Sequence, residues 1–308
     1  MPLKDNCGRP LLNLRIAITR RCNLRCEYCH LEGETKQSSL VKEMTAEEIV
    51  HIVRIAVGLG ISRLKITGGE PLMREDIADI IRDLGSLSGL ADLSMTTNAT
   101  KLAALAEELH AGGLKRVNVT LPTLDREAYR RLTGVSIEPV LEGIKTAVKA
   151  GLCPVKLNML ILKGENDGAV PEMIEFASQT GVVLQLIELE PLNITSEYYA
   201  AHHKPLDEYE ELLKRKAIKV ETRQFMQNRR IYCLPSARVE TVRPTESTEF
   251  CMNCTRLRVT SDGKLKPCLM TNDNLVDLLT SLRNGANDDE LVELFKLANF
   301  KRQPYNKH

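Results

Sequence analysis

A series of short apolar segments, alternating with segments of helical periodicity, most constrains the fold and runs from Asn13 to about Lys219. We expect strands at residues 14–19, 63–67, 92–97, 115–121, 154–162 and 182–189. The first helix is expected after a capping box formed by Thr45 and Glu48, and the next ones at about residues 76–84, 102–110, 139–150 and 171–180. Strand–helix units in series predict a parallel sheet with right-handed crossovers. The order of units is compatible with a partial barrel and with an open doubly wound sheet.

The pattern changes after about Lys219. Short strands are expected at residues 220–225, 229–234, 239–242 and 257–260, with a hairpin turn at 261–264. Helices are expected at 275–283 and 288–300. We therefore divide the chain into a core at residues 4–219 and a smaller, partly antiparallel C-terminal region at residues 220–308, packed together as one body.

Charge and hydropathy exclude some classes of protein. The formal net charge is +1, which argues against a broad surface for nucleic acid or membrane. No apolar segment follows the first residues, and the most apolar stretch, residues 182–189, is too short to span a bilayer. We expect a soluble, cytoplasmic protein.

Cysteine content points to metal chemistry. In a chain without a secretory signal, nine cysteines favour metal ligation over structural disulfides. Six of them form two compact triplets: Cys22, Cys26 and Cys29, and Cys251, Cys254 and Cys268. The other three, Cys7, Cys153 and Cys233, are expected to be small buried hydrophobic residues.

The first triplet has the spacing C-x3-C-x2-C and directly follows the first expected strand, where barrels and open sheets carry their chemistry. Three thiolates leave one iron of a 4Fe–4S cluster without a protein ligand. That iron is free to chelate a small molecule. A zinc site completed by His30 is the alternative, although structural zinc normally has a second pair of ligands.

The second triplet has the spacing C-x2-C-x13-C. It predicts another cluster with an open iron, or a closed site completed by Cys233. Arg256 and Arg258 follow Cys254, and guanidinium groups suit phosphate geometry, so the ligand is expected to be an anion. No P-loop pattern is present, so a nucleotide would not be held by one.

Three cations interrupt otherwise apolar expected strands: Arg15, Lys65 and Lys156. An unpaired charge inside a strand is costly. A bound anion would explain all three.

The C-x3-C-x2-C spacing, with Tyr28 just before the third cysteine, resembles the signature of the radical S-adenosylmethionine (radical SAM) superfamily. Gly68-Gly69-Glu70-Pro71, after the second expected strand, resembles the superfamily element that lies along the methionine part of SAM. The resemblance implies an incomplete (β/α)6 TIM-like barrel with a smaller C-terminal α+β region that binds a cluster. It also implies that reductive cleavage of SAM gives a 5′-deoxyadenosyl radical, which abstracts a substrate hydrogen.

Nearly the whole chain resembles a narrower family, the GTP 3′,8-cyclases of molybdenum cofactor biosynthesis. The similarity is carried by segments at residues 8–16, 65–74, 96–98, 117–121 and 154–158 and by the C-terminal triplet with its Arg-Leu-Arg. It implies two 4Fe–4S clusters, with SAM contacted by Tyr28, Gly69, Glu70 and Thr120. GTP contacts are implied for Arg15, Lys65, Thr96, Lys156, Arg256, Leu257 and Arg258.

The implied reaction takes hydrogen from ribose C3′ of GTP and joins C3′ to guanine C8, giving (8S)-3′,8-cyclo-7,8-dihydroguanosine 5′-triphosphate. An external one-electron reductant of the flavodoxin or ferredoxin type is implied, and the product passes to the cyclic pyranopterin monophosphate synthase. The alternatives are a radical SAM enzyme that modifies peptides and a non-enzymatic iron–sulfur or zinc protein. Family members usually end in two glycines, whereas this chain ends Gln-Pro-Tyr-Asn-Lys-His. We expect this tail, residues 303–308, to line the mouth of the substrate pocket.

Overall fold

The computed structural model of the chain describes residues 2–34, 42–244 and 248–305. Its centre is one curved sheet with the strand order β12-β11-β10-β1-β2-β3-β4-β5-β6-β9-β8-β7. The expected strands of the core are present as β1 (Asn13–Ala17), β2 (Arg63–Thr67), β3 (Asp92–Thr97), β4 (Arg116–Thr120), β5 (Lys156–Leu160) and β6 (Val183–Ile187). Neighbours among these strands are all parallel, which confirms the predicted partial barrel.

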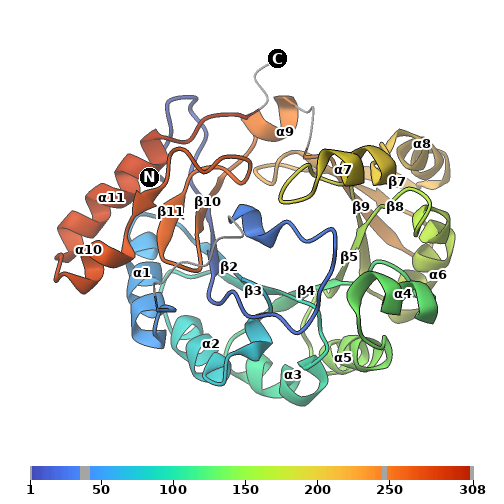
Figure 1. Cartoon of the computed structure of the whole chain (residues 1–308), viewed down its shortest axis with the longest axis horizontal. Helices are drawn as coiled ribbons and strands as arrows, with labels where there is room; N and C mark the ends of the chain where they lie inside the picture. Colours follow the sequence, from blue (N-terminus) through green and yellow to red (C-terminus); the bar gives the residue numbers. More distant parts are fainter. Residues whose placement is uncertain (1, 35–41, 245–247, 306–308) are drawn as a thin grey trace.

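Helices cover the outside of this sheet, as Figure 1 shows for α1, α2, α3, α5 and α6. Their bounds are α1 Ala46–Gly58, α2 Ile77–Gly85, α3 Leu102–Ala111, α4 Arg126–Thr133, α5 Glu138–Lys149 and α6 Val170–Thr180. Helix α1 begins with the predicted capping box, because Thr45 accepts from the Glu48 N–H at 3.2 Å and Glu48 accepts from the Thr45 N–H at 2.8 Å. Short 3-10 turns lie at Leu31–Gly33, Pro71–Met73 and Asp167–Ala169.

The core lies between the sheet and the helices. Leu14 and Ile16 of β1 are at most 1% exposed, and they pack with apolar side chains of α1 such as Ile49 and Ile52. Successive side chains of a strand point to opposite faces, so the residues between these apolar ones, such as Arg15, point to the concave side. The concave side of the sheet is therefore where polar chemistry collects.

The C-terminal region extends the sheet at both edges. The strands β9 (Arg238–Val242) and β10 (Arg256–Val259) lie parallel to β6 and β1 respectively. Beyond them, β8 (Arg229–Cys233), β7 (Lys219–Arg223), β11 (Lys264–Lys266) and β12 (Val276–Asp277) are added in antiparallel pairs. The expected C-terminal strands are thus present, but they continue the same sheet instead of forming a layer of their own. The division of the chain at residue 219 stays a prediction.

Other parts of the C-terminal third differ from expectation. The expected helix at 275–283 begins only at α10 (Leu279–Arg283), because Val276 pairs with Leu265 as part of β12. The helix expected at 288–300 is confirmed as α11 (Asp288–Phe300). Four described helices were not indicated by periodicity: α4 Arg126–Thr133 in the core, and α7 Ser196–His202, α8 Asp207–Lys216 and α9 Thr248–Met252. None of the described helices is long and apolar enough to cross a membrane.

Candidate active site

A cavity of about 470 Å³ lies on the concave side of the sheet. Alternate residues of the strands line it, and most are polar: Arg15, Lys65, Thr67, Thr96, Arg116, Asn118, Thr120, Lys156, Asn158, Gln185, Arg256 and Arg258. The same cavity reaches all the cysteines of both triplets. The interior of this barrel is thus a polar chamber instead of a packed core.

The first triplet lies in the loop after β1, which Figure 1 shows crossing the centre of the molecule in blue. Hydrogen bonds hold the loop at two places: the Arg25 N–H donates to the Thr133 carbonyl at 3.2 Å, and Asn193 donates to the carbonyls of His30 and Glu34 at 2.8 and 2.7 Å. Burial raises the pKa of Cys26 to about 12. A thiol of this kind binds as thiolate only when a metal compensates its charge.

The Gly-Gly-Glu element holds this loop against the sheet. The N–H groups of Gly69 and Glu70 donate to the carbonyls of Thr19 and Arg21, each at 2.8 Å. A Cβ on Gly69 would lie 2.4 Å from the Arg21 carbonyl oxygen, so only glycine permits this approach.

Glu70 is only 1% exposed, and protein donors already occupy much of its carboxylate. It accepts from the N–H groups of Leu72 and Asn98 at 3.0 and 2.6 Å and from the Thr97 hydroxyl at 2.6 Å. The side chain therefore ties the loop after β2 to the end of β3. Its predicted contact with SAM stays a prediction.

The second triplet is anchored by two buried arginines. Arg9 donates to the Cys251 carbonyl at 2.7 Å, and Arg302 donates to the Cys254 carbonyl at 2.6 Å. The Asp5 carboxylate forms ion pairs with both guanidinium groups, at 2.7 Å from Arg9 and 3.6 Å from Arg302. The N-terminal turn and the C-terminal segment thus meet behind the triplet.

Neighbouring arginines also affect the acidity of this triplet. Burial by itself raises the pKa of Cys254, but the charges of Arg256 and Arg302 outweigh it, and the pKa lies below its ordinary value. A thiolate is the form that ligates iron. Burial raises the pKa of Cys268, and Cys254 and Cys251 lie near enough to raise it further electrostatically, so the three thiols lie close together.

The remaining cysteines differ in part from expectation. Cys7 and Cys153 are exposed, so the prediction that they are buried is wrong. Cys7 lies in a tight turn whose N–H groups bond to Asp5, and Cys153 lies in the loop before β5. Cys233 is half-buried and does not line the cavity. Among the residues described, no group of three His, Cys, Asp or Glu side chains converges on a point that suits a single metal ion.

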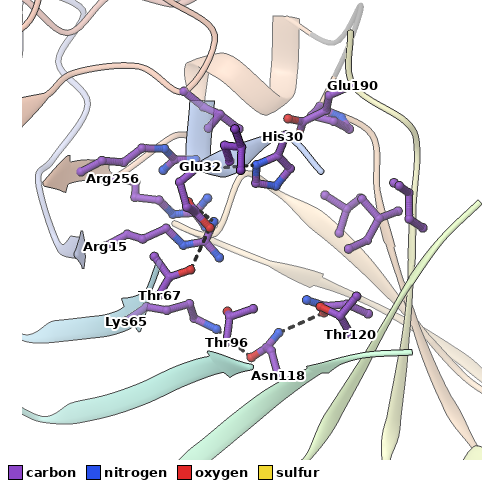
Figure 2. Close-up of a pocket in the computed structure, with 18 of the residues that line it drawn as sticks. Arg15, His30, Glu32, Lys65, Thr67, Thr96, Asn118, Thr120, Glu190 and Arg256 are labelled. Carbon is purple, nitrogen blue, oxygen red and sulfur yellow. Dashed lines mark hydrogen bonds and ion pairs between the residues drawn. The ribbon is translucent and has the colours of Figure 1, made fainter. Parts of the chain in front are cut away.

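Internal carboxylates partner two of the three strand cations, which corrects the expectation of unpaired charges. Arg15 donates to Glu32 at 3.3 Å, and Glu32 also accepts from the Thr67 hydroxyl at 2.8 Å, as Figure 2 shows. Burial alone would raise the pKa of Glu32, but the positive charges of Arg15 and other cations outweigh burial and lower the pKa to about 2. Lys156 forms an ion pair with Glu240. Because these partners lie far away in the sequence, the strand pattern could not indicate them.

Lys65 has a neutral partner, since its ammonium donates to the Asn118 amide oxygen at 2.7 Å (Figure 2). Burial, and then the charge of Arg15 and of other cations, lower the pKa of Lys65 well below its ordinary value. The cavity therefore holds more positive charge than its own carboxylates neutralise.

Several buried polar atoms that line the cavity have no hydrogen-bond partner within the described part of the chain. They are Arg15 Nε, Arg258 Nε, Thr96 Oγ1, Glu190 Oε2 and the Tyr28 hydroxyl. Buried donors and acceptors are normally satisfied. These atoms fit a polar ligand that completes their bonding, and three of them belong to residues predicted to bind GTP.

Leu257 differs from the other predicted contacts. Its side chain is 0% exposed and belongs to the core, between Arg256 and Arg258, which line the cavity. A ligand contact at this position would have to use the backbone. The tail expected at the pocket mouth is described only as far as Tyr305; Gln303 and Tyr305 line the cavity, and Lys307 and His308 lie outside the described residues.

Sequence reasoning missed further residues of this site: Glu32, Arg116, Asn118, Glu190, Arg223, Arg229, Glu240 and Arg302. For Arg116 and Asn118 an indication existed, because they alternate with Thr120 along β4 and so share its face. Arg223 and Arg229 come from the β7–β8 hairpin, whose distance in sequence from the core strands hid their role.

Comparisons with known proteins agree with this arrangement. Residues 16–177 match the family model described as "Radical SAM superfamily", and residues 182–308 match "Molybdenum Cofactor Synthesis C". Among solved structures, Streptococcus suis SuiB bound to its precursor peptide SuiA aligns with a TM-score of 0.65 and 19% identity, over 96% of this chain and 66% of that one. The structure of anSMEcpe with bound AdoMet aligns with a TM-score of 0.62 and 18% identity, over 96% of this chain and 81% of that one. At these identities the likeness shows the fold, that of a radical SAM protein.

Full-length relatives are more specific. A protein of Thermococcus kodakarensis named "Probable GTP 3′,8-cyclase" is 50% identical, over 98% of this chain and 99% of its own length. Proteins of the same name from Pyrococcus horikoshii and Methanothermobacter marburgensis are 48% and 45% identical, over 98% and 99% of this chain and 98% and 99% of their own lengths. The chain therefore belongs to the GTP 3′,8-cyclase family of the radical SAM superfamily.

Proposed function

We propose that this protein is the radical SAM lyase that converts GTP into (8S)-3′,8-cyclo-7,8-dihydroguanosine 5′-triphosphate, the first step of molybdenum cofactor biosynthesis. The observation that carries the proposal is one cavity bounded by both cysteine triplets, the Gly-Gly-Glu element and an excess of buried cations. A cation-lined chamber between two cluster sites suits an anionic substrate that has to be held close to SAM.

Cys22, Cys26 and Cys29 would hold the cluster that binds SAM, and Tyr28, Gly69, Glu70 and Thr120 would contact the cofactor. When bound, this cluster and SAM supply the 5′-deoxyadenosyl radical. The loop that carries these cysteines is held in place, because Gly69 and Glu70, which follow β2, form backbone hydrogen bonds with Thr19 and Arg21. A fixed loop holds SAM in one position relative to the substrate.

Cys251, Cys254 and Cys268 would hold a second 4Fe–4S cluster, which would bind the substrate through its guanine. Arg15, Lys65, Thr96, Lys156 and the segment from Arg256 to Arg258 bind GTP. Their contribution is to orient the ribose and the base so that C3′ and C8 lie close together, because a ribosyl radical has many other fates. The unpartnered donors Arg15 Nε and Arg258 Nε support this role.

Other proteins complete the reaction cycle. Cleavage of SAM consumes one electron, so the enzyme needs an external one-electron reductant of the flavodoxin or ferredoxin type. The cyclised nucleotide passes to the cyclic pyranopterin monophosphate synthase. Oxygen-sensitive clusters on free thiols suit the reducing cytoplasm, where we place the enzyme.

Anaerobic incubation of the reconstituted protein with SAM, dithionite and GTP tests the proposal. We expect 5′-deoxyadenosine and the cyclised nucleotide in equal amounts, identified by mass spectrometry. A protein that cleaves SAM but leaves GTP unchanged would refute the proposal, and the peptide-modifying alternative would then be favoured.

Alanine variants of the two cysteine triplets should lose different activities. Alanine at Cys22 should abolish SAM cleavage, whereas alanine at Cys268 should leave SAM cleavage and abolish cyclisation. Iron analysis should give about eight atoms per chain in the wild type and about four in either variant. Cys7→Ala and Cys153→Ala are matched controls, because both thiols are exposed and outside the cavity, and they should behave as the wild type. One zinc per chain with no second cluster would contradict the assignment.

A further inference from the structure

Two buried arginines lie directly behind the second cysteine triplet, where the two ends of the chain meet. The Arg9 guanidinium donates to the Cys251 carbonyl at 2.7 Å, and the Arg302 guanidinium donates to the Cys254 carbonyl at 2.6 Å. The two arginine side chains are only 5% and 1% exposed, and both line the cavity. Each positive charge is therefore held against a residue whose side chain would ligate iron.

The charge of this group does not balance. The Asp5 side chain is 0% exposed and forms ion pairs with both guanidinium groups; within the described part of the chain it is their one carboxylate partner. Its Oδ1 also accepts from the N–H groups of Cys7 and Arg9, at 2.9 and 3.0 Å. Two cations and one carboxylate leave an excess of one positive charge. Because this charge is buried, solvent screens it only weakly, and it acts on any charged group at the triplet.

Contacts between the chain ends fix the group in one position. Arg302 donates to the Asn299 amide oxygen at 2.9 Å, and the Asn299 amide donates to the Lys4 carbonyl at 2.9 Å. Figure 1 shows the same arrangement, with the N-terminus beside α11, the helix that contains Asn299. A charge that is already held in position costs no reorganisation when new charge develops next to it.

The first triplet has a different electrostatic environment. A buried carboxylate lies beside it, that of Glu70, which is 1% exposed and accepts from the Asn98 N–H at 2.6 Å. The Asn98 amide nitrogen lies 3.9 Å from the Cys22 sulfur, so this carboxylate is close to the triplet. Cations of the same loop, such as Arg21 and Arg25, are exposed, and solvent screens exposed charges strongly. Fixed buried charge is thus negative at the first triplet and positive at the second.

We propose that Arg9 and Arg302, opposed by Asp5, raise the reduction potential of the second 4Fe–4S cluster, so that it is reduced more easily than the first. This inference rests on the proposed function, which places one cluster at each triplet. Reduction takes one electron from the external reductant and converts a cluster of charge 2+ into one of charge 1+. Buried positive charge stabilises the reduced form, because surrounding charge and hydrogen bonds set the potential of such clusters. The three side chains are positioning residues that act through the cluster.

A potentiometric titration of the anaerobic, reconstituted protein, followed by electron paramagnetic resonance, tests this inference. Addition of SAM identifies the signal of the first cluster, which SAM changes. In the wild type the second cluster should have the higher midpoint potential. Arg302→Gln and Arg9→Gln should each lower the ratio of reduced to oxidised second cluster at a fixed potential by about tenfold, which is about 59 mV for one electron. Asp5→Asn, which removes the opposing charge and keeps the shape, should raise this ratio by a similar factor.

Two further variants separate charge from packing. Arg302→Lys keeps the positive charge and should have a midpoint potential close to that of the wild type. Lys296→Gln is the matched control, because it removes a positive charge from α11 at a side chain that is 48% exposed, pairs with Glu293 and does not line the cavity. It should leave both midpoint potentials unchanged.

Shifts of opposite sign in Arg302→Gln and Asp5→Asn would support the inference, because a purely structural role does not produce them. Unchanged midpoints in both variants, shifts in the same direction, or a wild-type second cluster with the lower midpoint would overturn it. If iron analysis shows that Arg302→Gln loses the second cluster, Asp5→Asn decides: a higher midpoint supports the inference, and an unchanged or lower one overturns it. A wild type that holds two clusters and cyclises GTP while its variants show no shift would refute only this inference. A wild type without a second cluster would refute the proposed function as well.

Discussion

Binding of GTP should depend on pH through Lys156. Burial, more than any other cause, lowers the pKa of this lysine from 10.5 to about 8, with Glu240 acting in the opposite direction. Since the pKa is depressed in the folded protein, the charged form that binds an anion is present below about pH 8 and is lost above it. The phosphates of GTP are fully ionised in this range, so their own titration does not mask the effect.

The magnitude follows from that pKa. If only the charged lysine binds, raising the pH from about 7.5 to about 9 reduces the charged fraction, and with it the affinity for GTP, by about eightfold. At about pH 8 the lysine is half protonated, so binding of GTP should take up about half a proton. Titration calorimetry in two buffers with different protonation enthalpies measures both quantities.

Lys156→Arg is the control, because arginine stays charged throughout this range. It should remove most of the pH dependence and the corresponding proton uptake, although Lys65, whose pKa is also depressed, can contribute to a slope that remains. A variant with the pH profile and proton uptake of the wild type would refute the reasoning.

Further predictions concern other parts of the cavity. Arg256→Ala and Arg258→Ala should each raise the dissociation constant of GTP by about 10- to 150-fold, with that of SAM little changed, as equilibrium binding can measure. Deletion of residues 303–308 should lower the rate of cyclisation and leave SAM cleavage largely intact, and a truncated enzyme with full cyclisation would show the tail to be dispensable. Gly69→Ala should abolish SAM cleavage because its Cβ would displace the cysteine loop, whereas Gly58→Ala, which meets nothing within 4 Å, should retain activity.

Local patterns were sufficient for most of the core. The six parallel strands appear near their predicted positions because each is an apolar run bounded by turn residues, and α1 and α11 begin with capping residues that are visible in the sequence. The two cysteine triplets could be located because the spacing of cysteines is read directly from the sequence and does not depend on the order of the strands. Cations inside apolar strands likewise pointed correctly to the interior of the barrel.

Long-range pairing could not be predicted in the same way. Glu32 and Glu240 neutralise Arg15 and Lys156, but each carboxylate lies in a segment whose own pattern gives no reason to place it in the chamber. The parallel pairing of β9 with β6 is similar, since adjacent strands in a sheet need not be adjacent in sequence. Periodicity reports the face of an element, whereas these contacts depend on which elements become neighbours.

The position of β9 and β10 has a consequence for synthesis on the ribosome. The six strands of the core emerge first, and both outer strands, β1 and β6, then expose unpaired N–H and C=O groups until the last third of the chain arrives to cover them. Open edges of this kind are templates for pairing with other chains. At roughly 5–20 residues per second, the nascent chain stays in this state for several seconds. The C-terminal strands therefore protect the newly made barrel from aggregation as well as completing its active chamber.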